Sequence, residues 1–331
     1  MKPRRLDDTG RFWSPGIRTG VEPGSEFHRV EYFGPVLGIL TAATLDEAID
    51  LQNATDFGLT AGLHTLDPSE LETWLERVEA GNLYVNRGIT GAIVRRQPFG
   101  GWKRSAVGAG GKAGGPNYLV HLGSWAPSPV TPTSTGAVSA PVSRLIAAAH
   151  DGAGSSGALA AIAAADEAAW SASFGRSIDV SQVGLERNVF RYRPVPVTVR
   201  LAEGGSPVEL LRVLAAGLRA GAPLTVSSAI GLSAGVRAAL GSASVTQASD
   251  ADFLASASRG ELTTSRVRLV GPAEARGQLA IALGGDPSVA VFAAPVTPSP
   301  RLELLPFLRE QAVTVTAHRF GNPDAWSEGV L

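Results

Sequence analysis

The sequence predicts an α/β protein in which a first α/β part is followed by a doubly wound, Rossmann-like second part. Two patterns carry this prediction: short apolar runs alternate with helical segments before residue 90, and they do so again, more regularly, after Val189. At about 150 residues per domain, a chain of 331 residues also suggests two domains. We place them at 1–125 and 158–331, joined at 126–157 by a linker with a short helix.

The first part is predicted to form a parallel sheet of βαβαβ order. Thr44 and Glu47 have the spacing of a capping box and open one helix, and Pro68 takes the first-turn position of a second helix. Trp74 lies on the apolar face of that second helix, so we interpret it as a core residue rather than a ligand contact. Buried strands are expected at 36–41, 57–63 and 82–86.

A glycine-rich loop follows the third strand and runs to Pro116. Neither a packed helix nor a regular strand is expected there, because each glycine costs roughly 1 kcal/mol of backbone entropy inside an element. Such a loop suits backbone that approaches a ligand closely, and free N–H groups in a glycine-containing turn make a natural carboxylate site. Five basic residues surround the loop, and a solvated basic surface is the alternative interpretation for each of them: Arg87, Arg95, Arg96, Lys103 and Arg104.

The second part begins after two segments of linker composition, a Pro/Ser/Thr-rich stretch at 126–142 and a Gly/Ser-rich stretch at 152–157. Strands are expected at 195–201, 224–229, 244–247, 267–270, 289–293 and 313–317. Helices are expected at 158–174, 207–220, 233–240, 250–258, 272–282 and 300–310. No glycine fingerprint follows the first strand, so we expect a dinucleotide-binding fold that lacks the residues for binding a dinucleotide.

The composition excludes several classes of function. A formal net charge of −1 gives no field that would attract nucleic acid or an anionic membrane. No apolar run approaches the ~18 residues of a membrane span, and none follows the basic residues at the N-terminus, so we expect a cytoplasmic protein. The five histidines are scattered, and we expect no metal site. The chain has no cysteine, which excludes disulfides and a cysteine nucleophile within it.

Two groups of motifs in the first part resemble the aldehyde dehydrogenase superfamily. One is E-x-F-G-P-V at 31–36; the other is N-L-Y-V-N-R at 82–87 with T-G-A at 90–92, Q-P-F-G-G at 97–101 and K-A-G-G-P at 112–116. Within the superfamily they are similar to the L-glutamate γ-semialdehyde (1-pyrroline-5-carboxylate) dehydrogenase branch. The resemblance implies that 1–125 is a truncated aldehyde dehydrogenase catalytic domain that ends in an oligomerisation strand at 119–125.

The same resemblance implies roles for five residues. Glu31 would accept hydrogen bonds from the ribose hydroxyls of NAD, and the Phe33 ring would pack near its nicotinamide. A surface or capping carboxylate is the alternative interpretation of Glu31. The backbone at Gly91 and Ala92 would hold the α-carboxylate of L-glutamate γ-semialdehyde, and the Phe99 ring would pack on its methylenes.

Two segments of the second part resemble the C-terminal domain of long bifunctional proline utilization proteins, which fuse a proline dehydrogenase to a γ-semialdehyde dehydrogenase. These segments are R-N-V-F-R-Y-R-P at 187–194 and T-A-H-R-F-G-N-P at 316–323. FAD would belong only to a proline dehydrogenase part, which this chain lacks. The resemblance implies an oxidoreductase of proline catabolism that forms homo-oligomers at full length.

Two hypotheses about function remain open at this point. In the first, the chain is the C-terminal portion of an NAD-dependent γ-semialdehyde dehydrogenase, and it is inactive alone because the family attacks the aldehyde with a cysteine thiolate. In the second, the chain is a complete non-catalytic module for assembly or for covering a substrate tunnel.

One further motif, Gly108-x-Gly110-x-x-Ala113, fits a loose dinucleotide fingerprint. No strand leads into it, so we discount it.

Overall fold

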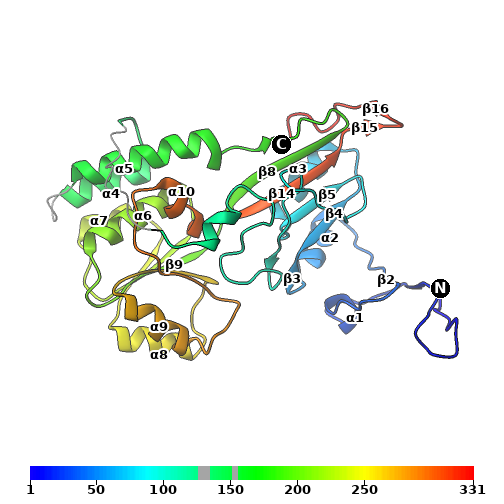
Figure 1. Cartoon of the computed structure of the whole chain (residues 1–331), viewed down its shortest axis with the longest axis horizontal. Helices are drawn as coiled ribbons and strands as arrows, with labels where there is room; N and C mark the ends of the chain where they lie inside the picture. The colour runs from blue at the N-terminus through cyan, green and yellow to red at the C-terminus, as the bar shows by residue number, and fades with distance from the viewer. Residues whose placement is uncertain (126–134, 151–155) are drawn as a thin grey trace.

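Two five-stranded sheets organise the protein (Figure 1). The computed structural model describes residues 1–125, 135–150 and 156–331. Residues 126–134 of the predicted linker and the larger part of the predicted break at 152–157 lie outside these ranges. The α/β class is confirmed, whereas the division at 1–125, 126–157 and 158–331 stays a prediction.

The first sheet has the strand order β4-β5-β14-β8-β7 and draws on both ends of the chain. Its strands are β4 (Thr60–Leu63), β5 (Asn82–Val85), β14 (Leu308–Thr316), β8 (Glu186–Pro194) and β7 (Ile178–Asp179). Strand β14 runs parallel to β5 and antiparallel to β8, and β7 is antiparallel to β8. The strand that we expected at 313–317 in the Rossmann-like sheet therefore lies in this other sheet.

Helices α2 (Leu45–Asn53) and α3 (Pro68–Arg77) cover this sheet and start at the predicted residues. The Thr44 hydroxyl accepts a hydrogen bond from the N–H of Glu47, and the Asp67 carboxylate accepts one from the N–H of Ser69. Trp74 is 2% exposed in the core that α2 and α3 form with β5 and β14, as expected for a packing residue.

The segment before α2 stands apart from both sheets in Figure 1. It contains β1 (Gly16–Arg18), α1 (Glu26–Arg29) and β2 (Val36–Gly38). The strand expected at 36–41 is shorter than predicted and pairs in parallel with β1. The prediction that it is buried is wrong, because Leu37 is 55% exposed. The expected run at 57–63 is divided into β4 and β3 (Phe57–Gly58), and β3 pairs with β6 (Trp102–Lys103).

The predicted oligomerisation strand at 119–125 is also wrong, because the chain forms a 3₁₀ helix at Tyr118–Leu122. Two further short strands, β15 (His318–Arg319) and β16 (Asn322–Pro323), form a hairpin near the C-terminus.

The second sheet is parallel and has the order β11-β10-β9-β12-β13, which is the 3-2-1-4-5 order of a doubly wound fold. Its strands are β9 (Val197–Leu201), β10 (Leu224–Ser228), β11 (Ser244–Gln247), β12 (Arg266–Val270) and β13 (Ala290–Phe292). One face packs on α4 (Ala140–His150), α5 (Ser156–Ala169), α6 (Pro207–Ala220) and α7 (Ala234–Ala239), and the other on α8 (Asp250–Ser258) and α9 (Ala273–Ala282). The predicted Rossmann-like topology is confirmed for these five strands.

Short helical segments complete the second part. A π-helical turn at Trp170–Phe174 extends α5, and the expected helix at 300–310 is shorter than predicted, comprising α10 (Pro300–Glu303) and a 3₁₀ turn at Leu305–Phe307 before β14 begins. None of the helices within the described ranges is both long and apolar enough to cross a membrane.

A buried ion pair joins α5 to α6. The Asp166 and Arg212 side chains are 1% and 5% exposed and form two hydrogen bonds of 2.6 and 2.9 Å, while the Arg212 Nε donates to the Thr297 carbonyl. Such a pair is worth little against an apolar replacement of both partners, but removing one partner leaves a buried charge uncompensated.

We therefore expect Asp166→Ala to lower the free energy of unfolding by about 3–5 kcal/mol. The adjacent Glu167→Ala is the matched control, because the pair of Glu167 with Arg219 is partly exposed and its loss is expected to cost about 1 kcal/mol or less. Urea unfolding of the three proteins measures both values. Equal losses would show that burial of the Asp166 pair does not govern its contribution.

Candidate functional site

The glycine-rich loop leaves the first sheet at the carboxyl end of β5. Asn86 turns the chain there with a left-handed φ of 57°, a conformation that asparagine tolerates better than most residues. Its side-chain amide donates to the Thr65 carbonyl at 2.7 Å and accepts from the Thr65 N–H at 3.0 Å. These bonds fix the direction in which the loop begins.

The residues predicted to hold the substrate occupy two places on this loop. Gly91 and Ala92 are exposed at the tip, where the Gly91 carbonyl accepts a hydrogen bond of 2.7 Å from the Tyr84 hydroxyl. Gly91 has a φ of 93°, which L side chains rarely adopt. Phe99 is half-buried at the base, where its backbone exchanges two hydrogen bonds of 2.9 Å with Ala113. The tip thus offers open backbone, and the base supports it.

Strand β8 of the second part holds the start of the loop. The Glu186 carboxylate forms ion pairs with Arg87 and with Arg96, and it accepts a hydrogen bond of 3.1 Å from Gln97 Nε2. The buried Gln97 also donates to Asn188 Oδ1 at 2.8 Å. Two of the five basic residues singled out in the sequence therefore bind the protein's own carboxylate.

Two more of those five basic residues are paired as well. Lys103 Nζ lies 2.7 Å from the Glu79 carboxylate, and Arg104 Nη1 lies 3.4 Å from that of Asp56. Arg95 is exposed and has a left-handed φ of 65°. The basic character of the loop sequence is thus largely neutralised locally, which favours the interpretation of these residues as structural.

Strand β14 holds the end of the loop through one buried carboxylate. Glu310 accepts a hydrogen bond of 2.8 Å from the backbone N–H of Lys112 and another of 2.8 Å from Asn117 Nδ2. Asn117 also donates to the Tyr192 hydroxyl at 2.6 Å. The Trp102 indole N–H donates to the Glu310 carbonyl at 2.8 Å. A single residue of β14 therefore fixes both the return of the loop and its base.

The Lys112 side chain is buried beneath the loop. Its Nζ donates to Asn82 Oδ1 at 2.8 Å and to the Gly100 carbonyl. Burial lowers the pKa of Lys112 from 10.5 to about 7, and the nearby Glu310 charge opposes this effect. A neutral amine has two N–H donors, which the two acceptors satisfy, so the deprotonated form suits this environment.

The residues predicted to bind NAD lie outside the loop, on the segment that leads into β2. Glu31 is exposed, and its carboxylate has no hydrogen-bond or ion-pair partner within the described residues; the Phe33 ring is 96% exposed. An unengaged carboxylate is suited to accept hydrogen bonds from a vicinal diol, and an open ring is free to pack on a ligand. These two residues therefore fit the proposed cofactor chemistry, although the structure does not bring them into contact with the loop.

Doubly wound folds hold a dinucleotide in a crevice at the carboxyl ends of the strands, which in the second, parallel sheet would lie between β9 and β12. That crevice is closed in this protein. There Arg200 reaches across to Asp250, with 2.6 Å between Nη2 and Oδ1, and the cavity beside them has a volume of about 10 Å³. A Cβ on Gly271 would lie 2.7 Å from that of Ala202. This crevice is filled by the protein's own side chains.

No metal centre accompanies the loop. Across 1–125, 135–150 and 156–331, no group of three or more His, Asp or Glu side chains is arranged to hold a metal ion.

Comparison with known proteins identifies the class to which the loop-bearing segment belongs. The sequence profile of the aldehyde dehydrogenase family matches residues 2–122, so this segment is part of an aldehyde dehydrogenase family domain.

Several similar proteins are named for proline utilization or as 1-pyrroline-5-carboxylate dehydrogenase. The chain is 36% identical over 249 residues to "Bifunctional protein PutA" of Rhizobium meliloti, covering 71% of this chain and 19% of that protein. It is 43% identical over 114 residues to the "1-pyrroline-5-carboxylate dehydrogenase" of Bacillus subtilis, covering 34% of this chain and 22% of that protein. The chain thus spans about a fifth of the length of these relatives.

A solved structure matches nearly the whole chain. Proline utilization A (PutA) from Corynebacterium freiburgense aligns over 97% of this chain and 29% of its own, with 41% identity and a TM-score of 0.75. The predicted resemblance of both parts to a bifunctional proline utilization protein is therefore confirmed.

Sequence reasoning missed the residues that hold the loop in place. Lys112 belongs to the K-A-G-G-P motif, but nothing in the motif indicates that its amine is buried. Glu186 and Glu310 had no local signal, because each lies far along the chain from the loop residues that it binds.

The buried amine makes a prediction about pH. Between about pH 7 and pH 10, the unfolded chain keeps the proton on Lys112 and the folded chain does not, so the unfolded state binds more protons and the free energy of unfolding rises with pH. The free energy of unfolding of the wild type, minus that of Lys112→Met, is therefore expected to rise across this pH range when both are measured by urea unfolding. The lysine signal that Lys112→Met removes from an NMR spectrum is expected to titrate near pH 7, and a midpoint near 10 would contradict the assignment.

Proposed function

We propose that this chain supplies the C-terminal part of an NAD-dependent dehydrogenase that oxidises L-glutamate γ-semialdehyde to L-glutamate in proline catabolism. The carrying observation is that the segment matched by the aldehyde dehydrogenase family, 2–122, is also the segment that presents Glu31, Phe33 and the open backbone at Gly91. The "1-pyrroline-5-carboxylate dehydrogenase" of Bacillus subtilis is 43% identical to this chain over 114 residues, which is close to the length of the matched segment.

Each site residue has a role that its environment supports. Glu31 accepts hydrogen bonds from the ribose diol of NAD, and Phe33 packs beside the nicotinamide; NAD, when bound, supplies the acceptor for hydride. Gly91 and Ala92 bind the substrate α-carboxylate through backbone N–H groups, and Phe99 contacts its methylenes. The hydrogen bond from Tyr84 to the Gly91 carbonyl supports this role, because it orients the peptide at the tip.

The covalent step requires residues that this chain does not contain. The family chemistry needs a thiolate nucleophile, and the 331 residues include no cysteine. The nucleophile must therefore come from other polypeptide, and we expect the chain by itself to be inactive. Leu119 and Leu122, which are 74% and 67% exposed beside the loop, offer apolar surface for the homo-oligomer that we expect of the full-length protein.

A second candidate function is that of a non-catalytic module that supports or covers the active site. One observation favours it: Glu186 of β8 and Glu310 of β14, both outside the matched segment, hold the two ends of the substrate loop. The two functions are compatible, because a supporting part can belong to an enzyme whose nucleophile lies elsewhere.

A chimera tests the proposed function directly. Residues 2–122 of this chain replace the matching segment of the Bacillus subtilis enzyme, which supplies the rest of the catalytic machinery. We expect NAD reduction with the semialdehyde. We also expect Glu31→Gln to raise the KM for NAD by about tenfold, since it weakens charge-assisted hydrogen bonds.

Within the same chimera, Gly91→Ala is expected to raise the KM for the semialdehyde, because a side chain at a φ of 93° distorts the tip. Gly88→Ala is the matched control: it lies on the same loop, has an ordinary φ and has open space around it. A folded chimera without turnover would refute the proposed function. Turnover with unchanged KM values in Glu31→Gln and Gly91→Ala would refute the assigned roles.

A further inference from the structure

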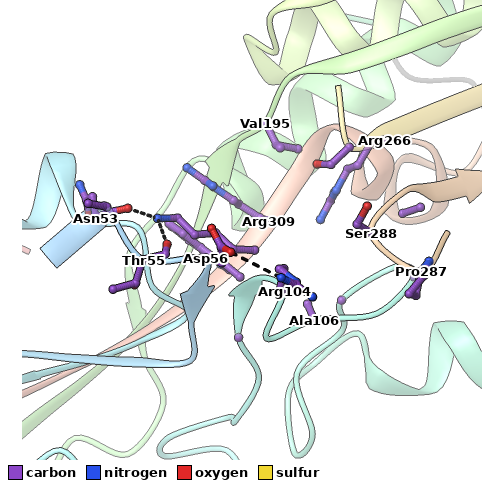
Figure 2. Close-up of a pocket in the computed structure, with 18 residues that line it drawn as sticks. Asn53, Thr55, Asp56, Arg104, Ala106, Val195, Arg266, Pro287, Ser288 and Arg309 are labelled. Carbon is purple, nitrogen blue, oxygen red and sulfur yellow. Dashed lines mark hydrogen bonds and ion pairs between the residues drawn. The ribbon is translucent and has the colours of Figure 1, made fainter. Parts of the chain in front are cut away.

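A cavity lies where the two parts of the chain meet, away from the tip of the glycine-rich loop. It is a cavity of about 460 Å³, between residues 53–56 and 101–110 of the first part and the amino ends of β12 and β13 (Figure 2). Doubly wound sheets hold nucleotides at the opposite, carboxyl edge, so this cavity is not the usual nucleotide crevice. Its volume falls within the range of about 300–1,000 Å³ that small-molecule sites occupy.

Two arginines without a carboxylate partner line this cavity. Arg266 Nη1 donates to the carbonyls of Leu305, Pro306 and Leu308 at 3.3, 3.0 and 2.7 Å, and its Nε and Nη2 make no hydrogen bond within the described residues. The Arg309 side chain makes no hydrogen bond or ion pair with any described residue, and its Nε is buried without a partner. Both side chains are half-buried, and a buried guanidinium nitrogen is ordinarily paired, so the unpartnered Nε of Arg309 is unusual.

Carboxylates near the cavity attract these two arginines or their neighbours but do not bind the two directly. Asp56 pairs with Arg104, which also attracts Asp286 beside the lining. Glu79 pairs with Lys103 and also attracts Arg309 electrostatically. Glu310 attracts Arg266 and offsets part of its charge, because the groups that bind its carboxylate, the Lys112 N–H and the Asn117 amide, are neutral. Neither arginine therefore has a carboxylate bound to its guanidinium, although neighbouring carboxylates attract both.

The pKa values of the two arginines reflect their burial and the charges around them. The pKa of Arg266 is lowered to about 10, chiefly by burial and also by the neighbouring Arg309 charge, while Glu310 opposes both effects. Burial likewise lowers the pKa of Arg309, while the Glu79 charge opposes this effect and the Arg193 charge adds to it. An anion between the two groups would relieve both effects.

Neutral donors and open backbone complete the lining. Ser265 and Ser288 contribute hydroxyl groups, and Figure 2 shows Ser288 below Arg266. Gly108 and Gly110 of the facing loop have left-handed φ values of 61° and 70°, and a Cβ on Gly110 would lie 4.0 Å from Arg266 Nη2. The backbone thus approaches the guanidinium closely and leaves room beside it.

We propose that this cavity binds an oxyanion, namely the phosphate or carboxylate group of a small molecule, between Arg266 and Arg309. The planar guanidinium fork matches the geometry of both groups. Trp102 supports the site by stacking: the Arg309 Cζ lies 3.8 Å from the centre of its ring, which holds the guanidinium at the cavity wall. The site is separate from Glu31 and Gly91, and the inference does not depend on the proposed enzymatic function.

Calorimetric titration with inorganic phosphate and with citrate, at constant ionic strength, tests the proposal on the full chain. We expect saturable binding of at least one anion, and the stronger of the two identifies the preferred group. Arg309→Met is the informative variant, because it keeps an unbranched side chain on Trp102 and removes only a guanidinium that bonds to nothing else. We expect it to weaken binding by about tenfold or more.

Arg144→Met is the matched control, because Arg144 is exposed on α4 and its replacement removes the same charge far from the cavity. Its affinity is expected to equal that of the wild type. The anion is also expected to raise the thermal unfolding midpoint of wild type and Arg144→Met, but not that of Arg309→Met.

Three outcomes would overturn the proposal. They are the absence of saturable binding of either anion up to about 10 mM, equal affinity in wild type and Arg309→Met, and equal weakening in Arg309→Met and Arg144→Met. In each case the two arginines would serve only to join the parts of the chain by stacking on Trp102 and Phe292.

Discussion

The hydrogen-bonded position of β14 between β5 and β8 is the constraint on which the rest of the structure depends. An unpaired side of β5 would leave backbone donors and acceptors without partners in the core, and β14 supplies them with four parallel pairings from Ala312↔Asn82 to Val315↔Val85. Its other side pairs with β8 over nine residues, from Leu308↔Pro194 to Thr316↔Glu186. The first and second parts of the chain are therefore joined through one sheet.

Side chains of β14 extend this constraint to the surroundings. The buried Gln311 donates to the Ala80 carbonyl at 2.9 Å and accepts from Arg191 Nε at 2.8 Å, which secures β14 to the chain on both sides. Glu310, the preceding residue, points the other way, as alternation along a strand requires, and binds the glycine-rich loop. One dipeptide thus fixes both the sheet and the loop, and Arg309 before it reaches the cavity proposed to bind an anion.

The sequence was sufficient for most local elements, because their signals are local. The capping residue Thr44, the first-turn Pro68 and the alternation of strands and helices from β9 to α9 were predicted close to their observed bounds. The sequence was insufficient where an apolar strand has a choice of neighbours. The apolar run at 313–317 is compatible with either sheet. Its apolar residues predict that it is buried, but they do not predict which strand it pairs with. The exposed β2 and the 3₁₀ helix at Tyr118–Leu122 show the same limit, because an apolar run alone sets neither burial nor conformation.

For the candidate site, motifs located the residues, but their environments came from the fold. The T-G-A motif located Gly91, but only the structure shows its φ of 93°. The low pKa of Lys112 could not be predicted, since it results from burial under the loop. The same holds for Glu186 and Glu310, whose partners become neighbours only when β8 and β14 enter the first sheet.

Native-state hydrogen exchange, resolved to single amides, tests the central role of β14 most directly. We predict that amides of β5, β8 and β14 share one high level of protection, and that the Lys112 N–H, which is bonded to Glu310, is protected with them although it lies in a loop. The contradicting result is a Lys112 amide that exchanges as freely as that of Gly88, with β5 much less protected than β14. In that case β14 would unfold cooperatively with the second part of the chain and not with β5.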